Sequence, residues 1–468
     1  MKSVWLKTLL CRGRQIIGLK KLLLTSLFTL IPISSALGQN TRPYRGSVQW
    51  SVLLCKFSDS PTPSKTPDFY YNMFIRQGTG GLNDYWRSIS YNGLNLDGSV
   101  VKGWYTQPFT LAQARSRSRA NRFQDCINAA RNSSTNPYTI PSGHLVAVIT
   151  YPDLDLFGLP GRGAFLPSTV DLGGMGHEVG HGLGLNHSFS NDPNYRNADW
   201  AQIGEYDDQW DLMSYANVFS TATSQFGFGG PGLNAHHVDR MGWLPIPRIL
   251  TFGADGIASR TVTLAALNHQ EATGYLLVRV PFDTRDPFHY YTVEFRRNDK
   301  WDAGFPNNIV LIHEVKRGSD GQYYSYLLRG HSGVRAPIQT LNANGVTITV
   351  NSILPRTNQA TVTITSNNVN AARSVYGPNT CKQGYVWREA DSSDYVCVIP
   401  ATRTQARNDN AQARARRNPN GGPYGPNTCI QGYVWREAFP GDLVCVTPNI
   451  RSQARSDNQQ AGNRLLKP

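Results

Sequence analysis

Apolar residues form short continuous runs in the first half of the chain and alternate with polar residues after about position 248. Residues 52–57 and 145–150 are almost wholly apolar. Runs of this length predict core strands that are buried on both faces of a sheet. Residues 112–130 predict a helix, and the segment 158–169, which is rich in Gly and Pro, predicts a loop.

The alternating part predicts a second kind of structure. Short stretches of period two, bounded by turn residues, are typical of an antiparallel β-sandwich, here over residues 248–370. Such a domain can bind substrate outside the active site or simply buttress its neighbour, and the sequence leaves both open. The expected strands are 261–264, 275–280, 290–295, 309–315, 347–350 and 361–365.

The C-terminal part repeats itself with a period of 48 residues. Residues 376–413 and 424–461 are identical at 27 of 38 positions. Strong internal identity indicates a duplicated module. Each unit is too small for a core of its own, so a disulfide is expected to staple it. We assign repeat 1 to residues 371–418 and repeat 2 to residues 419–468.

The first 38 residues differ from the rest. They hold six Lys or Arg and no acid, then the apolar run 22–33, then Ala36-Leu37-Gly38. This pattern predicts a signal peptide cleaved between Gly38 and Gln39, and hence a secreted protein. The run is too short to cross a bilayer, which needs about 20 residues, although an uncleaved anchor stays open. No later stretch predicts a membrane span.

Seven cysteines are consistent with export. Cys11 falls in the predicted signal peptide, and the remaining six can pair. The two cysteines within each repeat lie 16 residues apart, which makes local pairing the natural expectation. Spacing does not fix connectivity, and a reduced Cys55 or Cys126 stays open. The expected pairs are Cys381 with Cys397, Cys429 with Cys445, and Cys55 with Cys126.

The net charge of +14 is mostly peripheral. Six positive charges lie in the predicted signal, and the tail from Ala371 carries 13 basic and 7 acidic residues, or +6, which leaves about +2 for the rest. A basic tail can attract acidic cell envelopes or polysaccharides weakly, or can simply keep the protein soluble. No nucleic-acid-binding motif is present, and we expect a monomer.

Residues 177–187 read HEVGHGLGLNH, the zinc-ligand string H-E-x-x-H-x-x-G-x-x-H. On a helix, His177 and His181 lie on one face, one turn apart. Gly184 permits a sharp exit from the helix, which brings His187 round as a third ligand. Three imidazoles suit zinc and leave a fourth position for chemistry, and Glu178 can act as the general base.

Met213 lies 26 residues after His187 and supplies a candidate Met-turn. With this residue and the histidine string, the chain resembles the metzincin metallopeptidases, most of all the gametolysin-like group. The resemblance implies an α+β fold, with a twisted mixed sheet and a zinc helix in a catalytic domain over residues 39–247. It also implies that Tyr215 ligates zinc or stabilises the oxyanion; an ordinary buried tyrosine is the alternative. Further similar stretches are 52–59, 85–93, 103–105, 234–237, 241–244, 291–296 and 309–313.

The expected function is therefore a secreted endopeptidase with one catalytic Zn²⁺, acting on proteins or peptides. Two alternatives remain: a non-catalytic envelope-binding or adhesion protein with a vestigial metal site, and zinc-dependent hydrolysis of a non-peptide bond. The polar segment 188–210 can also supply oxygen ligands for Ca²⁺, but an ordinary surface loop fits it as well.

Overall fold

The structure is a computed structural model, and it shows a mixed α+β protein with several sheets. The residues that it describes are 44–215, 217–330, 336–369, 371, 380–382, 384–391, 394–439 and 441–465, all within the compact unit Gln39–Pro468. The predicted signal peptide and Cys11 lie outside this part of the chain. Across these ranges, no helix is both long and apolar enough to cross a membrane.

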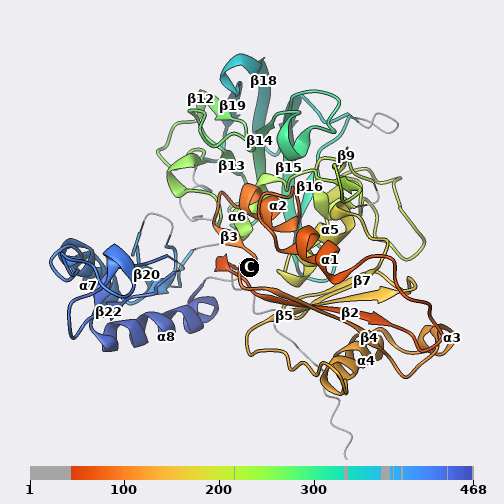
Figure 1. Cartoon of the computed structure of the whole chain (residues 1–468). Helices are drawn as coiled ribbons and strands as arrows, with labels where there is room; N and C mark the ends of the chain where they lie inside the picture. The colour runs from red at the N-terminus through yellow and green to blue at the C-terminus, as the bar shows by residue number, and fades with distance from the viewer. Residues whose placement is uncertain are drawn as a thin grey trace, which may run out of the picture. The chain divides into compact units, whose positions relative to one another are not determined.

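A five-stranded sheet organises the first half of the described chain (Figure 1). Both predicted core strands are present, as β2 and β5, and they pair in parallel. The strand order is β4-β2-β5-β7-β6, and only β6 runs antiparallel to its neighbour. The bounds are β2 Trp50–Lys56, β4 Val100–Thr106, β5 Leu145–Tyr151, β6 Phe157–Leu159 and β7 Gly163–Pro167.

The predicted loop 158–169 was wrong, because most of it forms strands β6 and β7. Phe165 within it and Phe157 just before it are both buried, and their rings stack with centroids 5.0 Å apart. Gly163 allows the backbone to approach the neighbouring strand, since a Cβ there would lie 1.8 Å from the Val146 carbonyl oxygen. Glycine inside a strand can thus mark a close approach of two backbones rather than a loop.

Helices cover both faces of this sheet. Residues of β2 alternate between two cores, with Val52 and Leu54 on one face and Leu53 and Cys55 on the other. The first face packs against α1 Pro67–Phe74, α2 Leu82–Ile89 and α5 Leu172–Gly182, and the second against α4 Arg119–Arg131. The Cys55–Cys126 disulfide, one of the expected pairs, joins β2 to α4.

The predicted helix 112–130 is two helices, α3 Leu111–Arg115 and α4 Arg119–Arg131. The prediction of one continuous helix was wrong because Ser118 interrupts it. The Ser118 side chain accepts a hydrogen bond from the backbone of Asn121 and caps α4.

The second half contains a six-stranded and a four-stranded sheet that contribute side chains to one apolar core. Every strand expected there exists, while β11, β16 and β17 were not predicted. The first sheet has the order β11-β13-β14-β15-β16-β8 and contains β11 Ile249–Thr251, β13 Leu277–Pro281, β14 Tyr290–Arg296, β15 Ile309–Arg317, β16 Tyr323–Leu327 and β8 Phe189–Ser190. The second has the order β12-β19-β18-β17, with β12 Ser259–Ala265, β19 Gln359–Ser366, β18 Val346–Leu354 and β17 Thr340–Ala343.

Pairing in these two sheets is antiparallel except at the edges of the larger one, where β11 and β8 pair in parallel. Strand β8 comes directly after the histidine string, so it links that segment to the second half by backbone hydrogen bonds. The predicted boundary at residues 247 and 248 stays a prediction. Other short elements are β1 Gly46–Ser47, β3 Leu94–Asn95, β9 Thr221–Ala222, β10 Phe228–Gly229 and α6 Ala235–Arg240.

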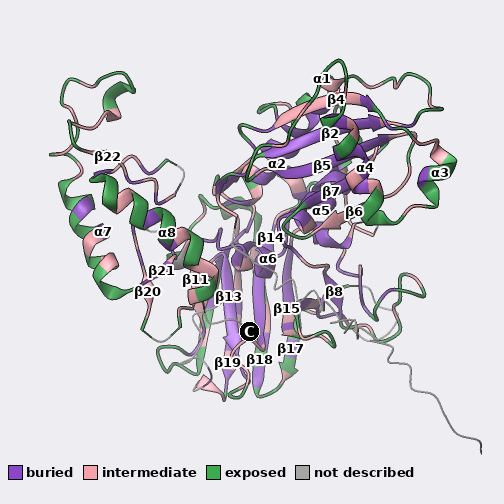
Figure 2. Cartoon of the chain, turned by 90° about the horizontal axis from the view of Figure 1, so that it is seen from below, coloured by how far each residue is buried: buried purple, intermediate pink, exposed green. Residues whose placement is uncertain are grey.

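Each C-terminal repeat consists of a two-stranded hairpin and one helix. Their exteriors are largely open to solvent, and Figure 2 shows α7 and α8 as mostly exposed and intermediate. The local disulfides Cys381–Cys397 and Cys429–Cys445 confirm the expected pairing. The elements are β20 Val386–Trp387, β21 Cys397–Val398 and α7 Pro400–Gln412, then β22 Val434–Trp435, β23 Cys445–Val446 and α8 Pro448–Arg464.

Candidate metal centre

Helix α5 carries the first two histidines of the string. The helix begins after Asp171, whose side chain accepts a hydrogen bond from the backbone of Gly174 at 2.8 Å. It ends at Gly182 with Leu183 as its C-cap, and Gly184 then adopts a φ of 94°. A residue with a Cβ is strained at this φ, so the glycine is what lets the chain turn back with His187, as the sequence predicted.

The three histidine side chains converge. The Nε2 atom of His181 lies 3.1 Å from that of His177 and 2.9 Å from that of His187. Two nitrogens bound to one tetrahedral zinc ion, each at about 2.0–2.1 Å, lie about 3.3 Å apart. The donor set therefore fits a single metal ion, and these three residues could hold one.

Each ring is oriented by its second nitrogen. The Nδ1 atoms of His177 and His181 contact the carbonyl oxygens of Leu212 and Leu185, at 3.1 and 2.8 Å. The Nδ1 of His187 contacts Glu205 Oε1 at 2.6 Å. Contacts of this kind hold the proton on Nδ1 and leave Nε2 as the ligand atom. The string thus supplies the ligand atoms and, through Leu185, orients one ring, while Leu212 and Glu205 from two other segments orient the other two.

Burial keeps the His177 and His181 rings in the neutral form. Burial, helped by the neighbouring His187, lowers the pKa of His177 to about 3. Burial and the two neighbouring histidines also lower the pKa of His181 well below its ordinary value. A metal ion binds neutral imidazole, so His177 and His181 are in the form that binds a cation at physiological pH.

Glu178 is buried beside the first ligand, with 5% of its surface exposed. Burial raises the pKa of Glu178 to about 8, against the opposing effect of Arg119. The Glu178 charge in turn helps to raise the pKa values of Tyr206 and Tyr215. These couplings place the carboxyl group within electrostatic reach of both tyrosines. A carboxyl with a pKa near neutrality can both take up and release a proton.

Met213 packs underneath the helix of the trio. It lies in a 3₁₀ turn, Leu212–Ser214, and is fully buried. A Cβ added at Gly180 would lie 2.8 Å from its sulfur atom, so the glycine makes room for the thioether. Asp211 fixes this turn, since it accepts hydrogen bonds from the backbone of Met213 at 2.6 Å and from the backbone of Asn234 at 2.7 Å.

The two tyrosines near the three histidines make different contacts. The Tyr215 ring lies 5.9 Å from that of His177, but its hydroxyl donates to Asp171 at 3.0 Å. The Tyr206 hydroxyl instead lies 3.0 Å from His187 Nε2. Tyr206, which the sequence did not single out, therefore contacts a ligand atom directly. Tyr215 touches the trio through its ring and supports the start of α5 through its hydroxyl.

The sequence also did not single out Glu205. Burial raises the pKa of this carboxyl, but hydrogen bonds from His187 and from the backbone of Gln202 outweigh it and lower the pKa below its ordinary value. Glu205 is thus a carboxylate at neutral pH that can hold the His187 ring. In the sequence, Glu205 is recognisable only as an acidic residue of the polar segment 188–210. That segment was considered as a source of Ca²⁺ ligands and not as a partner of His187.

Calcium binding stays a prediction. Among the described residues, only the three histidines form a group of three or more His, Cys, Asp or Glu side chains suited to a metal ion. In the segment 188–210, Asp208 lies 3.1 Å from His313 Nε2, and Asp207 accepts from Ser190 at 2.6 Å. These two carboxylates bind protein groups.

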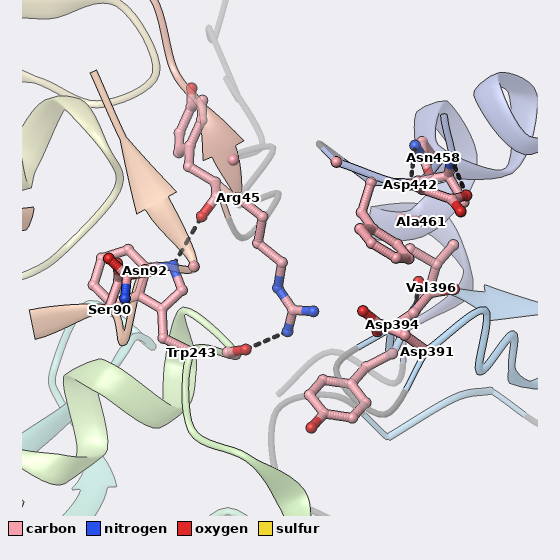
Figure 3. A pocket seen from close by; sticks show the side chains of 18 of the residues that line it. Arg45, Ser90, Asn92, Trp243, Asp391, Asp394, Val396, Asp442, Asn458 and Ala461 are labelled. Atoms are coloured by element: carbon pink, nitrogen blue, oxygen red, sulfur yellow. Dashed lines mark hydrogen bonds between the residues drawn. The ribbon is translucent and has the colours of Figure 1, made fainter. Parts of the chain in front are cut away.

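A cavity of about 1010 Å³ lies elsewhere in the molecule, and none of the three histidines lines it. Figure 3 shows Arg45 reaching across it, with a hydrogen bond to the Gly242 carbonyl. The Arg45 guanidinium also lies 4.9 Å from the Tyr395 ring, and Asp394 is bound to Arg388. Arg45 and Asp394 thus both have partners within the protein, and the group of side chains suited to a metal ion in the described chain is the histidine trio.

Comparison with known proteins adds no family to this picture. No protein-family model matches the chain, and no curated protein matches it either. The class that fold and site define is therefore a mixed α+β protein with a three-histidine candidate metal centre.

Proposed function

We propose that the chain is a secreted zinc-dependent endopeptidase of the metzincin type. The convergence of the three Nε2 atoms next to a buried Glu178 is the observation that carries this proposal. The string of five fixed residues, the glycine turn and the buried methionine agree with the resemblance seen in the sequence.

His177, His181 and His187 would hold the zinc ion, which would supply a Lewis acid and lower the pKa of a water molecule towards neutrality. Glu178 accepts a proton at its carboxylate and returns one to the leaving amine. Burial raises the pKa of Glu178, which makes its carboxylate a stronger proton acceptor. The Tyr206 hydroxyl, 3.0 Å from His187 Nε2, donates a hydrogen bond to the substrate oxygen as negative charge develops there.

Three disulfides fit a protein that leaves the reducing cytosol. A role for the basic repeats in binding acidic envelopes has weaker support. Eight of their arginines form ion pairs with acidic residues of the repeats themselves. These pairs involve six carboxylates and so offset fewer than half of the 13 basic residues, and the tail keeps its net charge of +6. Weak attraction to acidic envelopes therefore stays a secondary prediction beside the peptidase.

Metal analysis of the purified protein, combined with a protease assay on a denatured protein, tests the proposal. We expect one zinc per chain, and cleavage that a chelator abolishes and added zinc restores. A panel of peptide and non-peptide substrates in the same assay separates endopeptidase activity from other hydrolysis. A zinc-loaded protein that cleaves no peptide bond would overturn the peptidase assignment, and a chain that binds no metal would overturn the whole proposal.

A further inference from the structure

Each C-terminal repeat is completed by the chain end of the other repeat. The backbone N–H of Ile430 in repeat 2 donates to the carbonyl of Arg416, which follows helix α7 of repeat 1, at 3.1 Å. The equivalent bond joins Lys382 in repeat 1 to Arg464 at the end of α8 in repeat 2, at 2.9 Å. The segment after each helix therefore pairs with the hairpin of the other copy.

Two buried arginines add further hydrogen bonds between the two repeats. Arg388 of repeat 1 is 1% exposed and forms a bidentate pair with Asp394 of its own repeat. Its remaining N–H groups donate to repeat 2, to the Ala454 carbonyl at 3.3 Å, the Ala438 carbonyl at 3.1 Å and Asn458 Oδ1 at 2.9 Å. A guanidinium has five donors, and only both repeats together provide this set of acceptors.

The second arginine makes the mirror-image contacts. Arg436 of repeat 2 pairs with its own Asp442 and donates to the Ala406 and Ala390 carbonyls of repeat 1, at 3.4 Å each. These two alanines lie 48 positions before Ala454 and Ala438, the acceptors of Arg388. When residue i contacts residue j and the equivalent of j contacts the equivalent of i, the interface is self-complementary, as in a symmetric dimer.

No disulfide crosses this interface, because each repeat closes its own. The apolar contribution is small as well, since the buried cluster comprises Ala390, Ala438 and Ala454, with Phe439 packed against it. Specific polar contacts therefore decide what binds there. The residues that make them are shared by both copies, so the surface of one repeat selects another repeat.

We propose that each repeat is a docking module for a repeat of the same pattern. In this chain, repeats 1 and 2 bind each other, and a second copy of the chain can supply either half. The C-terminal region is then an intramolecular dimer that can exchange partners between two molecules.

Cutting the connection between the repeats tests the first half of this proposal in the full-length protein. A recognition sequence for a specific protease is inserted between Gly422 and Pro423, which are both exposed. After cleavage without reductant, we expect the fragment carrying repeat 2 to co-elute with the rest of the chain on gel filtration. Separation of the two fragments would overturn the proposal.

Two arginine variants sharpen this test. Arg388→Ala removes contacts to the other repeat, whereas Arg403→Ala removes only an ion pair with Glu389 of its own repeat. We expect the cleaved Arg388→Ala protein to release repeat 2 at concentrations at which the cleaved Arg403→Ala protein retains it. Equal retention by both variants would contradict a role for the exchanged arginine.

Partner exchange tests the second half. Two cleaved preparations, one isotope-labelled and one with an affinity tag after repeat 2, are mixed, unfolded in urea with disulfides intact, and refolded. When the tagged repeat 2 is captured, we expect about half of it to carry the isotope-labelled fragment that precedes the cut, because pairing between equal partners is random. Failure of the tagged fragment to bind either body would overturn the docking role, and binding to its unlabelled body alone would overturn exchange between copies.

Discussion

The candidate metal centre and the C-terminal repeats both take polar contacts from residues distant in sequence, yet different forces support them. Helix α5 is buried along nearly its whole length against a large apolar core that includes Trp50, Val179 and Met213. The repeats share a cluster of three small buried side chains. Their stability must come from disulfides and buried ion pairs, as is usual for units too small for a hydrophobic core.

This difference has a consequence for substitutions. In a large core, the geometry of one polar group can change while the fold persists, because apolar burial supplies most of the free energy. In the repeats, one polar group is a large part of the stability. We therefore expect site substitutions to change activity without unfolding, and repeat substitutions to cause unfolding without a change in activity.

The largest effect on stability is expected from Arg388→Ala. Removing this guanidinium leaves the Asp394 carboxylate buried without its partner, which costs about 3–5 kcal/mol. Hydrogen exchange should show loss of protection in both α7 and α8, while peptidase activity stays within about twofold of wild type. A parallel loss of activity would show that the two regions are not independent.

Glu178→Ala is the corresponding change at the metal centre. We expect kcat to fall at least about 100-fold, the low end for loss of a general acid–base group. Zinc content and the thermal unfolding of both regions should stay unchanged, as measured by metal analysis and calorimetry. Activity like that of wild type would remove Glu178 from the mechanism.

A pair of conservative variants compares the two tyrosines. A hydrogen bond to a charged group is worth about 1.5–3 kcal/mol, so Tyr206→Phe should lower kcat about 10- to 100-fold with little change in KM. Tyr215→Phe should lower kcat less than about 10-fold and should destabilise α5 by about 1 kcal/mol, because its hydroxyl is bound to Asp171. The reverse order of kcat values would assign the oxyanion role to Tyr215.

Glu205→Gln examines how the third ligand is held. Loss of a carboxylate that orients a metal-bound histidine typically weakens metal binding about 10- to 100-fold. We expect that loss in competition with a chelator, and near-normal kcat at saturating zinc. An unchanged metal affinity would mean that the 2.6 Å contact between Glu205 and His187 does not govern ligation.

The smallest effect concerns an ion pair on the surface of repeat 1. Hydrogen bonds from Arg403 and Arg407 lower the pKa of Glu389. A carboxyl whose pKa is lower in the folded state stabilises the fold above its ordinary pKa and loses this contribution as pH falls. Glu389→Gln should cost less than about 1 kcal/mol at neutral pH, and denaturant unfolding curves of variant and wild type should converge in acid. A gap that persists there would point to packing instead of charge.

The sequence predicted those elements that depend on local patterns. The core strands β2 and β5, the zinc helix α5 and the turn at Gly184 all follow from short-range patterns or from one residue's backbone preference. The prediction from sequence was wrong where the local composition suggested one structure and the tertiary contacts produced another. Glycine and proline suggested a loop where Phe157 and Phe165 are buried in strands, and the interruption at Ser118 was overlooked.

By itself, the sequence determined the identity of the three imidazoles, the carboxylate beside them and the duplication of the repeat unit, and it made local cysteine pairing within each unit the natural expectation. These features are local, because their spacing alone brings the groups within reach. Only the tertiary structure decided that Glu205 and Leu212 orient the rings, that Tyr206 contacts a ligand atom, and that each repeat completes the other. These contacts join segments remote along the chain, and such proximity arises only when the apolar cores and buried ion pairs have formed.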